Sequence, residues 1–106
     1  PMTICGDGEY YRDYTHVSDI VEANVLAMQS DKVGKGEIFN IGCGNACSVN
    51  KLAKLIGGKT IFVPDRPGDP RRSEADNTRA QEILGWKPKV SLEEGIRMMK
   101  KEWGLE

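Results

Sequence analysis

The chain has 106 residues, which is enough for one small domain spanning 1–106. Its net charge of −1 lacks the basic excess of a nucleic-acid-binding module, and no run approaches the roughly 18 apolar residues of a membrane span. The three cysteines are an odd number without framework spacing, which favours reduced thiols and a cytoplasmic location.

Strand and helix signals alternate along the first half of the chain. Residues 2–5 are predicted to form a strand that ends at the turn 6–8. A helix is predicted over 18–29 with Ser18 as its N-cap. This helix is apolar nearly all round, so it requires cover on more than one side. Residues 38–41 are predicted to form a second strand.

The middle of the chain continues the alternation. Ser48 is the expected N-cap of a helix that ends at the glycine pair 57–58. Its inward face is expected to hold Val49, Leu52, Ala53 and Ile56. Residues 60–63 then form a short apolar strand.

Two helices are predicted near the carboxyl end. Asp76 or Asn77 caps a short helix that Gly85 stops, and Ala80, Ile83 and Leu84 point inward. Ser91 opens a capping box and the last helix. Its apolar stripe is expected to hold Leu92, Ile96, Met99 and Trp103. Strands alternating with helices indicate an α/β fold.

The segment 63–72 is a stiffened loop. Its three prolines fix φ and donate no N–H, so it is neither helix nor central strand. Its three arginines suit a phosphorylated ligand, because a guanidinium can meet phosphate oxygens with two parallel donors. The alternative is an exposed loop in which arginines and aspartates pair with one another.

Several residues have catalytic or metal-binding potential but lack the required spacing. A zinc site would need four ligands, and Cys5, Cys43, Cys47 and His16 have no such spacing, so we expect no metal. His16 is interpreted as a structural histidine near a helix start rather than a general base. Residues 42–44 resemble a dinucleotide loop but lack its third glycine, so we interpret them as a tight turn.

Two polar residues outside the arginine-rich loop have open interpretations. Asn40, just before a glycine turn, points its amide at a ligand or satisfies backbone groups of that turn. Arg12 lies among tyrosines, where it either stacks on an aromatic ring or joins Arg66 in a two-arginine clamp for a diphosphate.

Three motifs occur in order along the chain. They are GDG at 6–8 with RDYTHVSD at 12–19, FNIG at 39–42 with SV at 48–49, and RPGD at 66–69 with AD at 75–76 and LGWKP at 84–88. In this order they resemble the carboxy-terminal third of the extended short-chain dehydrogenase/reductase family, the NAD-dependent nucleotide-sugar epimerases and dehydratases. The 12–19 motif is more similar to that of the UDP-sugar 4-epimerases.

The resemblance implies a small α/β substrate-binding part, with the Rossmann domain and its glycine-rich NAD loop absent from this sequence. The family's catalytic Tyr-x3-Lys pair is also absent, because Tyr10, Tyr11 and Tyr14 are followed four positions later by Tyr14, Thr15 and Ser18. NAD is therefore implied for the parent enzyme, and we expect none bound to this fragment and no catalytic residue in it.

The resemblance also implies a substrate site. Its members in this chain are Thr3, Cys5, Arg12, Asn40, Arg66 and Asp69. Arg12 and Arg66 match the family's diphosphate contacts, and Asp69 matches the residue that approaches the ribose. Asn40 matches a pocket residue. The strand 3–5 matches the segment along the base, although Cys5 stands where the family has an aromatic residue.

Two functions follow from these expectations. The first is the nucleotide-sugar-binding portion of an NAD-dependent epimerase, not competent alone. The second is a stand-alone nucleotide-binding or protein-interaction domain without enzyme activity. An upstream reading frame encoding the glycine-rich loop and Tyr-x3-Lys favours the first. We also expect self-association through surfaces that the Rossmann domain covers in the family, and no nucleic-acid or membrane partner.

Overall fold

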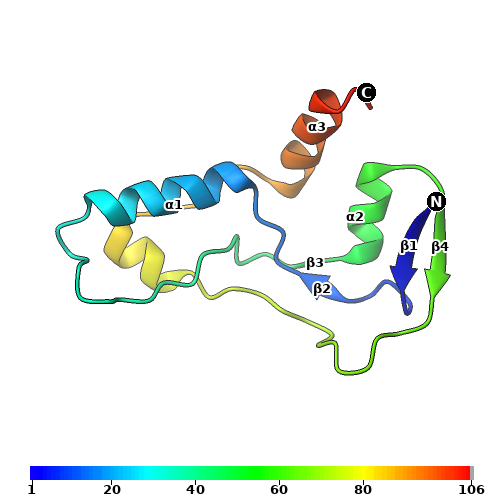
Figure 1. Ribbon diagram of the computed structural model, residues 1–106, viewed down its shortest axis with the longest axis horizontal. Coiled ribbons are helices and arrows are strands. Elements are labelled where there is room, and N and C mark those ends of the chain that lie inside the picture. The colour runs from blue at the N-terminus through cyan, green and yellow to red at the C-terminus, as the bar shows by residue number, and fades with distance from the viewer. Residues whose placement is uncertain (106) are drawn as a thin grey trace.

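The computed structural model describes residues 1–105 as short strands and helices (Figure 1). The elements are, in chain order, β1 (Met2–Cys5), β2 (Tyr11–Arg12), α1 (Val17–Gln29), β3 (Cys47–Ser48), α2 (Val49–Ile56), β4 (Thr60–Val63), the π-helical turn η1 (Ala80–Leu84) and α3 (Leu92–Glu102). The predicted α/β class is confirmed.

The strands form two small sheets. β1 and β4 pair in parallel, with Thr3 opposite Ile61 and Cys5 opposite Val63. β2 and β3 pair antiparallel through two residues each. The parallel pair needs a long crossover connection, and the segment between β1 and β4 contains α1 and α2.

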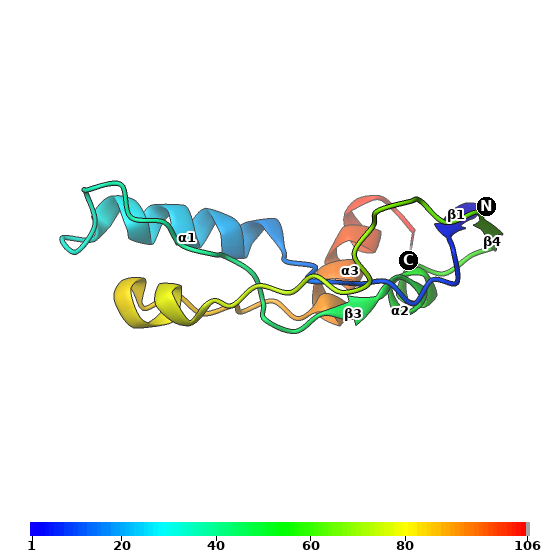
Figure 2. The same ribbon diagram turned by 90° about the horizontal axis from the view of Figure 1, so that it is seen from below.

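The molecule is long and thin, with principal extents of 49 × 35 × 16 Å. α1 and η1 lie side by side at one end, while β1, β4 and α2 lie at the other (Figures 1 and 2). The two ends are joined through β2, β3 and the extended segments beside them. Few residues are therefore buried from all sides.

The core of the α1 end is built around a tryptophan. Trp86 is fully buried, and it packs with Ala23 of α1 and Ala80 of η1. Partly buried residues packed against this cluster are Leu26, Phe39, Ile41 and Leu84. The indole nitrogen of Trp86 donates a hydrogen bond of 2.9 Å to the Asp19 carbonyl, so its polar atom is also satisfied.

Asp19 is a buried carboxylate that joins α1 to the segment before α3. Asp19 is only 2% exposed to solvent. Oδ1 accepts from the Lys89 N–H at 3.0 Å, and Oδ2 accepts from the Val90 N–H at 3.1 Å. A charged acceptor with two backbone donors is a strong arrangement inside a protein, so Asp19 fixes where the 86–90 segment lies.

The predicted ends of three helices are confirmed. Ser48 caps α2 by accepting from the Lys51 N–H, and Ser91 caps α3 by accepting from the Glu94 N–H, both at 3.1 Å. Gly85 ends η1 in the left-handed conformation at φ 67°, which glycine adopts without a Cβ clash.

The predicted strand at 38–41 is wrong. The segment is extended but pairs with no strand among the residues described. A strand requires a neighbour to complete its hydrogen-bond ladder. Phe39 and Ile41 instead use their side chains to pack against the tryptophan cluster.

The predicted N-cap of the first helix is also wrong. α1 starts one residue earlier than expected, at Val17, and His16 is the capping residue. The His16 Nδ1 accepts from the Ser18 N–H at 3.1 Å, and it also lies 2.7 Å from the Ser18 hydroxyl oxygen. The interpretation of His16 as a structural residue at a helix start is therefore confirmed.

Two details of the carboxyl-terminal helices differ from expectation. η1 is a π-helical turn rather than an ordinary helix, and Asp76 accepts from Thr78 just before it. The stripe of α3 is not buried along its length: Met99 is half exposed and Trp103 is 75% exposed. Met99 lines a hollow together with Leu52 and Ile56 of α2, and this hollow is open enough to leave Met99 half exposed.

Candidate functional site

Five of the six predicted site residues surround one hollow of about 320 Å³. It is lined by Thr3 and Cys5 of β1, Tyr10 and Arg12 beside and within β2, Val49 of α2, and Arg66 and Asp69 of the arginine-rich loop. Sequence positions more than sixty residues apart thus meet at one place. The volume is at the lower end of the range for small-molecule sites.

The three arginines of the loop behave differently. Arg71 pairs with Asp7, and Arg72 pairs with Glu74. Within residues 1–105, the Arg66 guanidinium forms no hydrogen bond or ion pair, and neither does the Asp69 carboxylate. The predicted pairing of arginines with carboxylates is therefore found for Arg71 and Arg72, and ligand binding stays a prediction for Arg66. Arg66 and Asp69 are the members left available to a ligand.

Arg12 connects β2 to this loop. Its Nη1 donates to the carbonyl oxygens of Tyr11 and Pro70, each at 2.8 Å. A guanidinium carries five N–H donors, so these two contacts orient the side chain and leave donors for an anion. The guanidinium carbon also lies 5.8 Å from the centre of the Tyr10 ring.

Asn40 lies outside the first hollow. It lines a second, more open hollow of about 510 Å³, and Arg12 lines both. Other members of the second hollow are Asp13, Phe39, Ile41, Gly42 and residues 73–76. Asn40 is exposed and its side chain bonds to no backbone group of the turn among the residues described. Arg12 thus stands between the two predicted parts of the site.

Asp13 is a functional anchor that sequence reasoning missed. Its carboxylate accepts three backbone N–H groups, from Cys43 at 2.9 Å, Gly44 at 2.8 Å and Ala75 at 3.1 Å. These bonds hold two walls of the second hollow together. Its place directly after Arg12 in the 12–19 motif was the available signal.

The turn 42–44 is closed to a dinucleotide phosphate. A phosphate-binding loop needs free backbone N–H groups, but those of Cys43 and Gly44 already donate to Asp13. A Cβ on Gly42 would lie 2.6 Å from the Ala75 side chain and 2.7 Å from Asp13. Glycine is therefore needed here for close packing, and these residues do not fit NAD.

Asp7, between two glycines, is a second residue that sequence reasoning missed. It receives two N–H bonds of 3.0 Å from Arg71, and one of 2.9 Å from the Glu9 backbone. These bonds lower the pKa of the Asp7 carboxyl from 3.8 to about 2, and the largest contribution comes from the Arg71 guanidinium. Asp7 is consequently a charged anchor for the arginine-rich loop.

The glycines on either side of Asp7 are required by close approach. Gly6 and Gly8 have φ values of 65° and 75°. A Cβ on Gly6 would lie 2.1 Å from the Asp65 carboxylate, and one on Gly8 would lie 2.0 Å from the Asn50 side chain. The GDG motif therefore lets two polar side chains reach the turn backbone.

The remaining chemistry-bearing residues form no further centre in the part of the chain described. Cys5, Cys43 and Cys47 are free thiols, and burial raises the pKa of Cys43 and of Cys47. No group of three or more potential metal ligands occurs among residues 1–105. None of the described helices is both long and apolar enough to cross a membrane.

Comparison with known proteins identifies the fold. A UDP-glucose 4-epimerase of Thermotoga maritima, solved with UDP-glucose, superposes on 99% of this chain with a TM-score of 0.82 and 47% identity. A UDP-glucuronic acid 4-epimerase of Bacillus cereus, solved with UDP-glucuronic acid and NAD, gives a TM-score of 0.83 over 92% of the chain at 32% identity. The fold is that of the carboxy-terminal part of an extended short-chain dehydrogenase/reductase.

Sequence relatives give the same family. The UDP-glucose 4-epimerase of Mycolicibacterium smegmatis is 46% identical over 99 residues, which is 88% of this chain. The model of the family described as GDP-mannose 4,6 dehydratase matches residues 1–99. The chain belongs to this family of NAD-dependent epimerases and dehydratases. It spans 31% of the Mycolicibacterium protein and 36% of the Thermotoga chain, about a third of each.

Proposed function

We propose that this chain is the nucleotide-sugar-binding portion of an NAD-dependent sugar epimerase of the UDP-sugar 4-epimerase kind. The observation that carries the proposal is the hollow at which Arg12, Arg66 and Asp69 meet β1. The similar Thermotoga and Bacillus proteins were solved with UDP-glucose and with UDP-glucuronic acid, which supports a UDP-sugar as the ligand.

Each residue around the hollow has a distinct role in this proposal. Arg12 and Arg66 approach the diphosphate from opposite segments, and each offers unused N–H donors to its oxygens. Asp69 accepts from the ribose hydroxyls, while Thr3 and Cys5 lie along the base. Asn40, beyond Arg12 in the second hollow, contacts the sugar side of the ligand.

The chemistry of the reaction is proposed to lie outside these residues. NAD, which the Bacillus protein was solved with, would supply the oxidation and reduction of the sugar in the parent enzyme. The turn 42–44 does not fit NAD, because the N–H groups of Cys43 and Gly44 already bond to Asp13. The isolated chain should therefore bind UDP without interconverting UDP-glucose and UDP-galactose. The three free thiols support a cytoplasmic location.

The proposal is tested by measuring UDP affinity with calorimetry for Arg12→Ala, Arg66→Ala and the double variant. Each charge-assisted contact should contribute about 1.5–3 kcal/mol, roughly ten- to a hundredfold in Kd. Arg66→Lys should recover only part of the loss, since lysine has no planar fork. Arg72→Ala is the matched control, because Arg72 lies on the same loop but bonds to Glu74.

The clamp is refuted if neither single substitution weakens UDP binding. It is also refuted if Arg72→Ala weakens binding as much as Arg66→Ala does, since the effect would then be general electrostatics.

Self-association of the chain belongs to the same proposal. The accessible surface is 7419 Å², whereas a compact monomer of 11.7 kDa exposes about 5,900 Å². The radius of gyration is 16.3 Å, against about 13 Å for a compact chain of this length. The excess surface, about 1,500 Å², exceeds the roughly 800 Å² that each partner buries in a stable interface of standard size.

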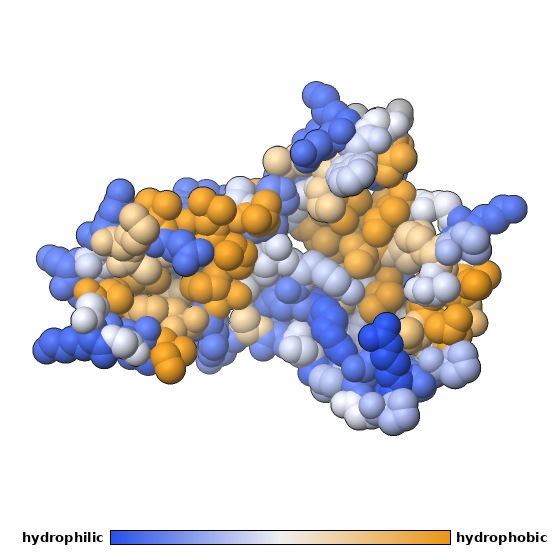
Figure 3. Space-filling model, in the orientation of Figure 1, coloured by the Kyte–Doolittle hydropathy of each residue, from blue (hydrophilic) through white to orange (hydrophobic). Residues whose placement is uncertain are grey.

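The surface proposed to associate is the α1 stripe, made of Val17, Val21, Val25 and Met28. These side chains are 68%, 55%, 40% and 84% exposed, and apolar residues gather over α1 in Figure 3. Sedimentation equilibrium should show concentration-dependent association that Val25→Glu weakens. Asn45→Glu adds the same charge at an exposed loop and should leave it unchanged. A monomer at high concentration would contradict the proposal.

A further inference from the structure

Tyr10 is a buried tyrosine that lies between the hollow and the arginine-rich loop. It is 9% exposed, and its ring forms part of the wall of the hollow. Its hydroxyl donates a hydrogen bond of 2.6 Å to Oδ1 of Asp65, the residue directly before Arg66. This hydrogen bond joins residues 55 positions apart, and it holds the backbone directly before Arg66.

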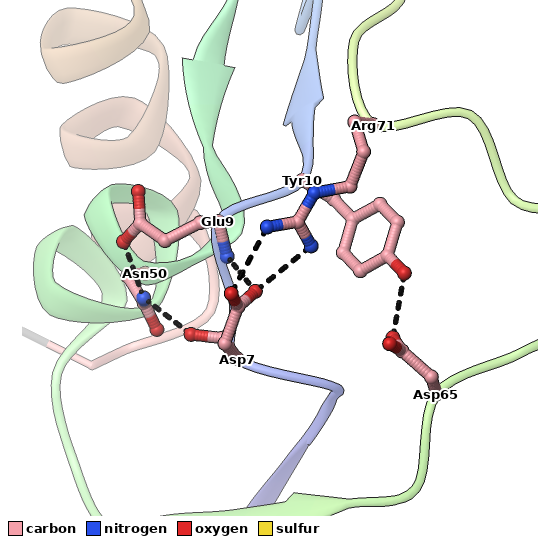
Figure 4. A network of polar contacts seen from close by, with 6 residues as sticks. All are labelled: Asp7, Glu9, Tyr10, Asn50, Asp65 and Arg71. Atoms are coloured by element: carbon pink, nitrogen blue, oxygen red, sulfur yellow. Dashed lines mark hydrogen bonds and ion pairs between the residues drawn. The ribbon is translucent and has the colours of Figure 1, made fainter.

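The same ring also contacts the far end of the loop. The Arg71 guanidinium carbon lies 4.5 Å from the centre of the Tyr10 ring, a cation–π distance. Figure 4 shows this guanidinium across the ring while its two nitrogens face Asp7. Tyr10 thus holds residue 65 with its hydroxyl and residue 71 with its ring face.

The segment 7–10, which carries Tyr10, is itself held by hydrogen bonds to α2. The Nδ2 of Asn50, in α2, donates to the Asp7 carbonyl at 2.9 Å and to the Glu9 carboxylate at 2.7 Å (Figure 4). The Val49 N–H donates to the Tyr10 carbonyl at 3.0 Å. Tyr10 and the residues before it are therefore attached to α2, and Tyr11 after it pairs with Ser48 of β3, which gives the ring a stable position.

The loop has little internal support of its own. Its three prolines donate no N–H, and its internal backbone bond is a long one, from the Asp69 N–H to the Arg66 carbonyl at 3.4 Å. Residues 64–70 are all exposed. Contacts at the two ends of the loop are therefore what can restrict Arg66 and Asp69 to the hollow.

We propose that Tyr10 is a positioning residue that holds Arg66 and Asp69 at the nucleotide site through Asp65 and Arg71. This rests on the proposed function, because it assigns how the ligand-binding loop is held. The observed affinity is proportional to the fraction of molecules whose loop is in the binding conformation, so it falls when that fraction falls. Tyr10 raises that fraction without needing a bond to the ligand itself. The Asp65 carboxylate, which accepts the hydrogen bond of the Tyr10 hydroxyl, raises the pKa of that hydroxyl above its ordinary value.

The variant Tyr10→Phe removes the hydroxyl and keeps the ring. UDP affinity should fall roughly three- to tenfold, the effect of one hydrogen bond. The matched control is Tyr11→Phe, since the Tyr11 hydroxyl bonds to no residue within 1–105. Asp65→Asn keeps an acceptor for the hydroxyl and should stay near wild type, whereas Asp65→Ala should match Tyr10→Phe.

A double-variant comparison tests whether Tyr10 acts through Arg66. In the Arg66→Ala background, Tyr10→Phe should cause a much smaller further loss, because the side chain that it positions is gone. An equal loss in both backgrounds would overturn the proposal, since Tyr10 would then act independently of Arg66.

A measurement without ligand separates this proposal from the proposed function. Amide hydrogen exchange at Asp69 should become faster in Tyr10→Phe and remain unchanged in Tyr11→Phe, in chains that keep the same unfolding midpoint. Equal exchange in the two variants would overturn the positioning role. If UDP does not bind at all, the proposed function fails, while the exchange result still decides whether Tyr10 holds the loop.

Discussion

Replacement of Asp19 by alanine should destabilise the fold more than any surface change. The substitution leaves the backbone N–H groups of Lys89 and Val90 without the carboxylate that accepts from them. Both bonds are made to a charged group that is 2% exposed, and hydrogen bonds to charged groups contribute about 1.5–3 kcal/mol each. We therefore expect Asp19→Ala to lower the free energy of unfolding by about 3–5 kcal/mol.

Asp19→Asn provides an intermediate case. It keeps the side-chain volume and one acceptor oxygen but turns an NH₂ group toward the second backbone donor. The expected loss is about 1.5–3 kcal/mol, smaller than that of alanine. Asp31→Ala is the matched control, because Asp31 is an exposed aspartate just beyond the end of α1.

Urea unfolding followed by tryptophan fluorescence measures these differences. Trp86 is fully buried, whereas Trp103 is 75% exposed, so a Trp103→Phe background leaves Trp86 as the reporter of the core. The reasoning is refuted if Asp19→Ala costs less than about 1 kcal/mol, or no more than Asp31→Ala, because the buried bonds would then contribute little.

Two further predictions concern the walls of the site. The folded-state pKa of Asp7 is about 2, below its ordinary 3.8, so its bond to Arg71 stabilises the fold above about pH 4 and is lost as pH falls toward 2. The stability difference between the wild type and Asp7→Asn should accordingly be present at pH 6 and disappear near pH 2 in denaturant titrations; a constant difference would contradict this. Gly42→Ala places a Cβ 2.6 Å from Ala75 and 2.7 Å from Asp13, so urea unfolding should show a loss of about 1–3 kcal/mol from overpacking. A loss below about 0.5 kcal/mol would contradict this prediction, because it would show that the backbone of the turn shifts to accept the Cβ with little change in stability.

The local structure of several elements was determined by the sequence itself. Ser48 and Ser91 cap helices, and Gly85 ends a helical turn, because each depends on a side chain and the backbone within three or four residues. The strands at 2–5 and 60–63 are apolar runs between turn residues, which local patterning also predicts. The three motifs and their order were enough to indicate the family.

Only the tertiary structure decided which polar residues pair within the fold and which are left unpaired at the proposed site. Arg66, Arg71 and Arg72 look alike in sequence, but Arg71 meets the distant Asp7, Arg72 meets the neighbouring Glu74, and Arg66 meets no carboxylate among the residues described. Asp13 and Asp19 gained their anchoring roles from backbone donors 30 to 71 residues away. The strand expected at 38–41 did not form, because a strand depends on a neighbour that its own residues cannot provide.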